Sequence, residues 1–298
     1  MKIAVVASPA NASSAGSVMV MLEASGNDTI GLKFNDSWKN ETHDRIESLL
    51  SGTSHLLCVV DSHDSAAAWL SYVIGLARGR ELPLLIFSVD PAWRPGPWLA
   101  DLQVFYALDE LVGYYAVERD AWSLKEARRR AKASLLELGI SWHSESLSQC
   151  VRDGDTKAVA LFLDSGFPPD ARDKSGVPIV CLATRSRHRS IVELLLDRGA
   201  NVDAQSDDRG YSPLMDAAQQ GDASLLELVL DRGADPNLIS KDGQTALILA
   251  VGRSDAPVVE RLLASGADPD FADKLGLSAM KYAKLFNNQK IVEAFASA

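Results

Sequence analysis

The second half of the chain repeats one phrase about every 33 residues, and this period constrains the fold more than any other feature. The phrase is an apolar helical stretch that ends in a glycine and an acidic turn. Its copies occupy residues 158–170, 191–203, 225–237 and 258–270. A fixed period of this size predicts a stack of structural repeats, an architecture that forms extended surfaces for holding another macromolecule. The glycines of the four copies are 33, 34 and 33 residues apart: Gly166, Gly199, Gly233 and Gly266.

A second motif begins about ten residues after each glycine, as in residues 207–218. Here Gly210 follows acidic residues, which predicts a tight turn because glycine adopts positive φ without steric cost. Ser212 and its counterpart Thr245 are placed to cap the next helix, and Pro213 suits a first helical turn. Each repeat is therefore predicted to be a turn, a helix, a second turn and a second helix.

These two motifs resemble the ankyrin repeat, with its pattern D-x-x-G-x-T-P-L-H-x-A-A followed by V-x-x-L-L-x-x-G-A. Residues 207–272 match it through two successive units, and residues 173–206 match it with lapses. Residues 144–172 and 273–298 look like the terminal caps that a finite stack needs. The resemblance implies an all-α ankyrin repeat solenoid of about five units over residues 141–298.

In ankyrin proteins the partner surface is formed by the turn tips and the inner helices. The resemblance therefore implies a concave face that captures a protein partner, although charges at these positions could also simply solvate the surface. Tyr211, flanked by Arg209 and Arg185, is predicted to be an exposed anchor because Tyr and Arg are enriched in binding hot spots. Leu285 and Phe286 are predicted to pack in the core or cap of the last unit. The predicted partner-binding residues are Arg152, Lys174, Arg185, Asp208, Arg209, Tyr211, Gln219, Gln220, Lys241, Asp242, Gln244 and Arg253.

Residues 1–140 lack this period and alternate short apolar runs with helical patterns. Near-continuous apolar strands separated by helices predict a parallel sheet that is covered on both faces. The predicted class is a flavodoxin-like α/β domain, in which ligands bind at the carboxyl ends of the strands. Strands are predicted at 3–7, 29–34, 55–60 and 82–87, and helices at 12–24, 41–51, 65–79 and 121–138.

Small polar residues follow two of these strands and open onto helix N-termini. Ser8 and Asn11 come after the first strand, and Asp61, Ser62 and Ser65 come after the strand at 55–60. Backbone N–H groups at such positions could hold an anion or a ribose. The same residues could instead cap the helices, and the sequence leaves both interpretations open.

Residues 61–87 resemble the third helix and fourth strand of TIR-like domains, and also nucleoside deoxyribosyltransferase-like domains. The resemblance rests on Ser65-x-x-x-Trp69 and on Leu82-Pro-Leu-Leu-Ile-Phe87. It implies a catalytic glutamate at the position of Val73, and a valine can neither accept a proton nor stabilise an oxocarbenium-like centre. Asp61 and Asp64 are the candidate catalytic carboxylates that could replace it.

Composition narrows the class of partner. A net charge of −10 and a pI near 5.0 argue against a nucleic-acid binder, whose phosphate contacts need a basic face. Cys58, Cys150 and Cys181 lie in apolar stretches and are predicted to be buried thiols in a reducing compartment. No cysteine or histidine cluster predicts a metal site, and no apolar stretch is long enough to predict a membrane span. The expected location is the cytoplasm.

The leading hypothesis is a protein-interaction scaffold without a cofactor. Its ankyrin array captures a protein partner next to a non-catalytic TIR-like α/β domain. The alternative is an NAD- or nucleotide-processing enzyme, of the glycosidase or deoxyribosyltransferase type, that is targeted by its repeats.

Overall fold

The computed structural model describes residues 1–33, 40–64 and 68–297. These residues form two compact units, Met1–Glu126 (unit 1) and Ala127–Ala298 (unit 2). The boundary falls inside the helix α4, Leu108–Glu137. The predicted boundary at residue 140 lies just after this helix.

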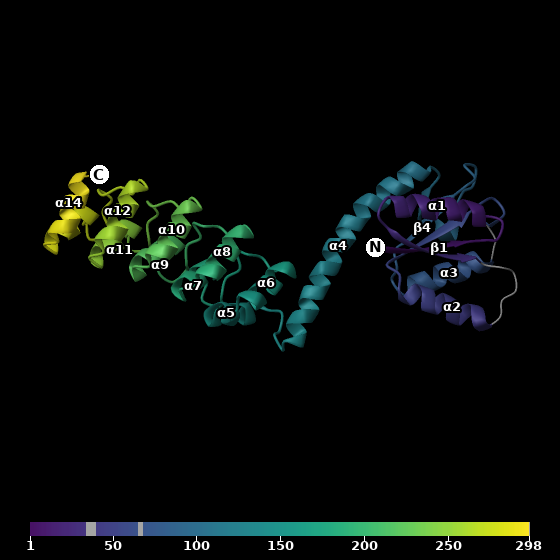
Figure 1. The fold of residues 1–298 in the computed structure, drawn as a ribbon, viewed down its shortest axis with the longest axis horizontal. Helices are drawn as coiled ribbons and strands as arrows, with labels where there is room; N and C mark the ends of the chain where they lie inside the picture. Colours follow the sequence, from purple (N-terminus) through teal and green to yellow (C-terminus); the bar gives the residue numbers. More distant parts are fainter. Residues whose placement is uncertain (34–39, 65–67, 298) are drawn as a thin grey trace. The chain divides into compact units, whose positions relative to one another are not determined.

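Unit 1 is built on a sheet whose described strands are all parallel and lie in the order β2-β1-β3-β4-β5 (Figure 1). Every residue of β3 is buried, as are those of β4, because both faces of the sheet are covered. The strands are β1 Lys2–Ala7, β2 Asp28–Lys33, β3 His55–Val60, β4 Leu84–Ser88 and β5 Gln103–Phe105.

Helices pack on both sides of this sheet, which confirms the predicted α/β arrangement (Figure 1). On one side, α1 (Ala12–Ala24) and the first part of α4 bury Leu22 and Tyr115. On the other side, α2 (Asn40–Ser51) and α3 (Ala68–Gly79) bury Ile46 and Val73.

The prediction of a helix at 121–138 placed its start too late, since α4 begins at Leu108. Leu111 and Tyr115 lie four residues apart and are both fully buried, so this segment carries a helical spacing that marks its inner side. The strand β5 was missed because three residues are too few to show a period. The strand predicted at 82–87 begins two residues later, at Leu84. Phe34 and residues 65–67, which end one predicted strand and begin one predicted helix, lie outside the described residues.

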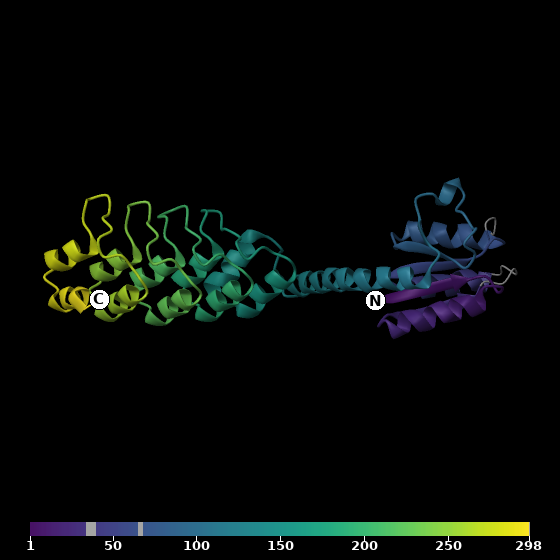
Figure 2. The ribbon, with the colours of Figure 1, turned by 90° about the horizontal axis from the view of Figure 1, so that it is seen from above.

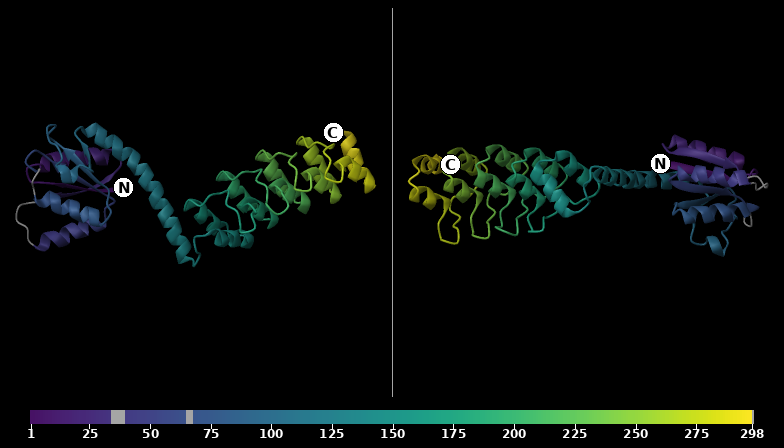
Figure 3. Two further views of the ribbon diagram at one scale, coloured as in Figure 1. Left: turned by 180° about the vertical axis from the view of Figure 1, so that it is seen from behind. Right: turned by 90° about the horizontal axis from the view of Figure 1, so that it is seen from below.

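Unit 2 contains, in its described part, five helix pairs that stack side by side (Figures 1 and 2). The first helices of the pairs contact each other in one layer, and the second helices contact each other in another. Figure 3 shows the same two layers from behind and from below. The first helix of each pair is here called the inner helix, and the second is called the outer helix. The inner helices are α5 Ser144–Asp153, α7 Ile179–Arg185, α9 Pro213–Gln220, α11 Ala246–Gly252 and α13 Ala279–Leu285. The outer helices are α6 Thr156–Asp164, α8 Arg189–Asp197, α10 Ala223–Asp231, α12 Ala256–Ala264 and α14 Gln289–Ser297.

The predicted helix caps and turns of unit 2 are confirmed. The hydroxyl of Ser212 accepts a hydrogen bond from the N–H of Met215, and Thr245 does the same for Ile248, both at 3.3 Å. Gly210 has a φ of 70°, in the left-handed region that favours glycine. These caps and turns fix the start of each inner helix from local residues alone.

The turn tips of successive repeats are joined by backbone hydrogen bonds and project from the same side of the stack (Figure 2). The N–H of Lys241 donates to the carbonyl of Arg209, and the N–H of Lys274 donates to the carbonyl of Asp242, both at 3.0 Å. The tips therefore form a continuous edge, and a change in the backbone of one tip disturbs the hydrogen bond to the next.

We expect Ser254→Gly to raise the free energy of unfolding of unit 2 by about 1 kcal/mol. Ser254 has a φ of 61° between α11 and α12, where the preceding unit has Gly221 at 66°. Glycine removes the steric cost of this left-handed conformation, and urea unfolding followed by circular dichroism measures the gain. The control is Ser175→Gly at an exposed turn position outside the left-handed region, which should bring no gain.

Candidate functional site

The inner face of unit 2 is the surface formed by the turn tips and the inner helices α5, α7, α9, α11 and α13. The predicted partner-binding residues all belong to the turn tips and inner helices, although Tyr211 is buried. Arg152, Arg185, Gln219, Gln220 and Arg253 lie at the carboxyl ends of inner helices. The others lie at the tips or directly after them: Lys174, Asp208, Arg209, Tyr211, Lys241, Asp242 and Gln244.

A charged cluster occupies the middle of the inner face and joins two repeats. The guanidinium of Arg185 donates from Nε to Asp216 at 2.9 Å and from Nη1 to Asp208 at 2.7 Å. Arg209 donates to the other oxygen of Asp216 at 3.2 Å. Only 2% of Asp216 is exposed, so both of its oxygens are satisfied inside the protein.

Burial raises the pKa of the Asp216 carboxyl to about 6, while Arg185 and Arg209 act in the opposite direction. The hydrogen bond from Arg185 holds the pKa of Asp208 well below its usual range. Arg185 and Asp208 are therefore both charged at neutral pH and already bind each other. Sequence reasoning missed Asp216, although a carboxylate within the apolar run Pro213–Ala218 signals a residue that needs a buried partner.

Tyr211 is not the exposed anchor that the sequence predicted, since only 7% of it is exposed. It follows the turn glycine at the base of the tip, where its ring belongs to the core of unit 2. The guanidinium of Arg209 lies 4.4 Å from the ring centroid and covers one side of it. The Tyr211 hydroxyl donates to Gln244 of the next repeat at 3.2 Å, so this residue links two repeats.

A groove of about 270 Å³ opens on the inner face beside these residues. Its floor is apolar, since Ile248 and Leu249 are 4% and 6% exposed. Phe286, predicted to pack in a core or cap, is instead 49% exposed on the groove wall, and Leu285 beside it is 67% exposed. Both residues sit at the end of α13, which packs inward through Ala279 and Ala283 instead. The groove is lined by Tyr211, Gln219, Gln244, Ile248, Leu249, Gly252, Arg253, Tyr282 and Phe286.

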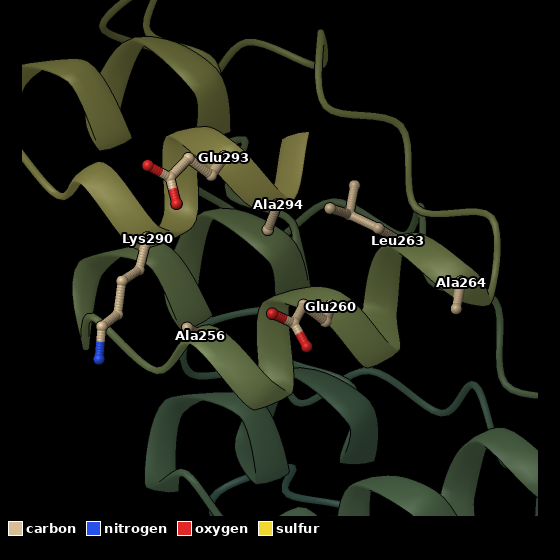
Figure 4. A pocket seen from close by; sticks show the side chains of 7 residues that line it. All are labelled: Ala256, Glu260, Leu263, Ala264, Lys290, Glu293 and Ala294. Carbon is tan, nitrogen blue, oxygen red and sulfur yellow. The ribbon is translucent and has the colours of Figure 1, made fainter. Parts of the chain in front are cut away.

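A second depression, of about 730 Å³, lies between the outer helices α12 and α14 (Figure 4). Glu260 and Glu293 stand on its two sides, and most of the remaining lining is alanine. It has a single larger apolar side chain, Leu263, and no aromatic lining. This outer surface therefore differs in chemistry from the inner groove, and variants on it provide a control for variants in the groove.

In unit 1 the structure brings together the polar residues that follow β1 and β3. One carboxylate oxygen of Asp64 accepts hydrogen bonds from the side chains of Asn11 at 2.8 Å and Ser8 at 3.4 Å, and from the N–H of Asp61 at 3.2 Å. The other oxygen accepts from Trp69 Nε1 at 3.2 Å. Asp64 and Asn11 are 5% and 4% exposed.

This arrangement ties the two loops together at the point where the strand order reverses. Asp61 caps its own turn by accepting from the N–H of His63 at 2.8 Å. Ser62 is exposed, and Ser65 lies outside the described residues. Val73, at the position of the glutamate in the resembled families, is fully buried in the core of unit 1.

We expect Asp64→Ala to lower the free energy of unfolding of unit 1 by about 2–3 kcal/mol. The variant leaves the donors of Asn11 and Trp69 without their buried acceptor. Urea unfolding followed by tryptophan fluorescence measures the loss. Asp28→Ala, at the exposed first residue of β2, is the control and should cost under about 1 kcal/mol. A similar loss in both variants would show that Asp64 does not hold the loops.

The three cysteines are buried free thiols, as predicted. Burial raises the pKa of the Cys58 thiol to about 12 and also raises that of Cys181, so neither is a reactive thiolate at neutral pH. Within the described ranges, no three His, Cys, Asp or Glu side chains gather closely enough to hold a metal ion. In the same part of the chain, no helix combines the length and apolarity needed to cross a bilayer.

Comparison with known proteins identifies the family. The family model for ankyrin repeats in three copies matches residues 147–240 and 214–298. An ankyrin repeat-containing protein of Treponema pallidum (strain Nichols) is 33% identical over 214 residues, which is 72% of each chain. That stretch is longer than unit 2, so the similarity extends into unit 1. Ankyrin repeats generally bind protein partners, and this chain belongs to the ankyrin repeat family.

Proposed function

We propose that this chain is an interaction scaffold whose ankyrin repeats capture a protein partner on the inner face. The observation that carries the proposal is the inner groove, with its apolar floor, its aromatic wall and its charged rim. Such a combination is typical of binding surfaces, in which a few large side chains supply most of the affinity. The outer depression has no aromatic side chain in its lining.

Two features of the groove support its use as a docking site. The rings of Phe286 and Tyr282 lie 5.7 Å apart and form an aromatic wall, of which Phe286 is half exposed. Arg253 also lines the groove, and its guanidinium donates to the carbonyl of Gln219 at 3.2 Å. A partner side chain that enters the groove would therefore meet both apolar and cationic groups.

Unit 1 is proposed to be a TIR-like, flavodoxin-type domain without catalysis, in a cytoplasmic protein. Its strand order 2-1-3-4-5 is the order of flavodoxin-like sheets, which supports the fold. The buried Val73 supports the absence of glycosyl chemistry at that position, since it offers no carboxylate to a substrate. In this proposal unit 1 accompanies the repeats and does not process a small molecule.

The alternative function is processing of NAD or a nucleotide by unit 1. It is favoured by the way the Asp64 carboxylate joins Ser8 and Asn11 to the backbone of Asp61 at the point where the strand order reverses, which is where open α/β sheets bind ligands. Asp61 is the better catalytic candidate, because Asp64 is buried and accepts four hydrogen bonds. Incubation with NAD, nucleotides and deoxynucleosides, followed by mass spectrometry, tests it. Turnover that is lost in Asp61→Asn would establish an enzyme.

For the scaffold proposal, we expect Arg253→Ala combined with Phe286→Ala to weaken capture of the partner about tenfold or more. The reason is that both side chains line the groove and neither is buried in the core. Chemical crosslinking of the full chain in extracts of its source cells, followed by quantitative mass spectrometry, measures the capture. Glu260→Ala combined with Lys290→Ala changes the outer depression and should leave capture unchanged. Equal capture by both double variants would place the partner elsewhere.

A further inference from the structure

The cations of the inner face fall into two groups, and the first group is neutralised within the chain. Arg152 pairs with Asp173 at 3.2 Å, and Arg172 pairs with Asp207 at 3.1 Å. Arg185 pairs with Asp208 and Asp216 in the charged cluster. A partner that binds this half of the inner face must compete with carboxylates that are already in place.

The second group lies on the last two repeats and is not neutralised in this way. All five of its members are exposed, and among the described residues none forms an ion pair. Three of them donate to backbone carbonyls, as Lys281 Nζ does to Gly276 at 3.0 Å, and such bonds hold a side chain without cancelling its charge. This second group, here called the basic patch, consists of Lys241, Arg253, Lys274, Lys281 and Lys284.

The acids near the basic patch do not balance it. Residues 238–255 and 271–287 contain three acids, Asp242, Asp255 and Asp273. Asp273 is 8% exposed, and its carboxylate accepts from the hydroxyl of Tyr282 at 2.7 Å and from two backbone N–H groups. Asp255 is half-buried, and one of its carboxylate oxygens caps α12 by accepting from the N–H of Val258 at 3.3 Å. Five exposed cations therefore face only the exposed Asp242 and the half-buried Asp255 in these two segments, so the patch is locally positive on a chain whose net charge is −10.

The basic patch and the groove belong to the same surface. Arg253 is a member of both, and the α13 helix carries Lys281 and Lys284 together with the aromatic wall residue Tyr282. An apolar pocket rimmed by unpaired cations is complementary to an apolar side chain flanked by carboxylates. A neutral or basic partner would leave these cations desolvated and unpaired at the interface, which is costly.

We propose that the groove and the basic patch bind an acidic peptide segment that carries one large apolar side chain. The apolar side chain enters the groove between Ile248 and Phe286, and the flanking carboxylates pair with Arg253 and Lys284. This proposal rests on the scaffold function and adds the chemistry of the partner to it. It also implies that affinity falls as salt rises, because exposed charge pairs are screened.

The test is selection from a displayed library of random peptides against the full chain, followed by affinity measurement with the labelled winners. We expect winners rich in Asp and Glu around a Leu, Phe or Trp. Arg253→Glu combined with Lys284→Glu should weaken their binding about tenfold or more, and Phe286→Ser should weaken it as well. The matched control is Lys290→Glu, which reverses one charge on the outer helix α14 and should change affinity little.

Several results would overturn the proposal. Acidic winners that bind Arg253→Glu/Lys284→Glu as tightly as the unchanged chain would place the site elsewhere. Neutral or basic winners whose binding depends on Phe286 would leave the scaffold function standing and refute the acidic partner. A library without winners, in a protein shown to be folded, would count against both. Binding of phosphatidylglycerol vesicles or self-association in place of peptide binding would assign the patch to a different occupant.

Discussion

Replacing Asp216 with asparagine is expected to lower the free energy of unfolding of unit 2 by about 3 kcal/mol or more. The substitution keeps the shape of the side chain and removes the charge that Arg185 and Arg209 share. The Arg185 guanidinium, whose side chain is 19% exposed, would keep only Asp208 as an ionic partner. The amide of asparagine has only one oxygen, so its NH₂ group would face the guanidinium donors of one arginine. Neither of these donors would then have a buried acceptor. Urea unfolding followed by circular dichroism gives the loss directly.

The matched control for this prediction is Asp164→Asn. Asp164 pairs with Arg198 at 2.7 Å, close to the distances in the buried cluster, but both side chains are 40% exposed or more. An exposed pair of this kind contributes about 1 kcal/mol or less because water already solvates both charges. If Asp164→Asn cost as much as Asp216→Asn, burial would not be the reason for the stability of the cluster.

The charged cluster also shows how far sequence reasoning reaches in unit 2. Caps and turns such as Ser212 and Gly210 depend on neighbours within a few residues, so the repeat motif predicts them. Arg185 and Asp216 are 31 residues apart and meet only because one repeat stacks on the next. Tyr211 is buried for the same reason, since its hydroxyl reaches Gln244 of the following repeat. The repeat motif describes the residues of one repeat, so it does not predict which of them are buried by the next repeat in the stack.

In unit 1, too, local features could be predicted from the sequence and contacts between distant residues could not. Continuous apolar runs predict buried strands such as His55–Val60, because each carries its own burial pattern. The topology of a parallel sheet then places the loops after β1 and β3 side by side, so the proximity of Ser8 and Asn11 to the loop that carries Asp61 and Asp64 follows from the strand order. The burial of Asp64 and its hydrogen bond from Trp69 could not be predicted, because no local pattern marks an aspartate whose partners come from other parts of the chain.

The tip glycines lead to the second large effect: Gly210→Ala is expected to cost unit 2 about 3 kcal/mol. A Cβ atom at Gly210 would come within 2.8 Å of the backbone nitrogen of Lys241, at a φ of 70°. Backbone cannot move aside as a flexible side chain can, so the two tips must separate. The hydrogen bond from Lys241 to the carbonyl of Arg209 would then lengthen or break. Urea unfolding measures the cost, and faster hydrogen exchange of the Lys241 amide would report the local opening.

Gly199→Ala separates the steric effect from the conformational one. Gly199 has a φ of 87°, but a Cβ atom there would meet nothing within 4 Å. Alanine should therefore pay only the cost of a left-handed conformation, about 1–2 kcal/mol. Equal losses of unfolding free energy in the two variants would mean that close contact between the tips adds no steric cost at Gly210. A larger loss in Gly210→Ala, with weaker peptide binding by the folded variant, would mean that contact between tips holds Lys241 beside the groove. The edge formed by the tips would then be part of the binding surface as well as of the fold.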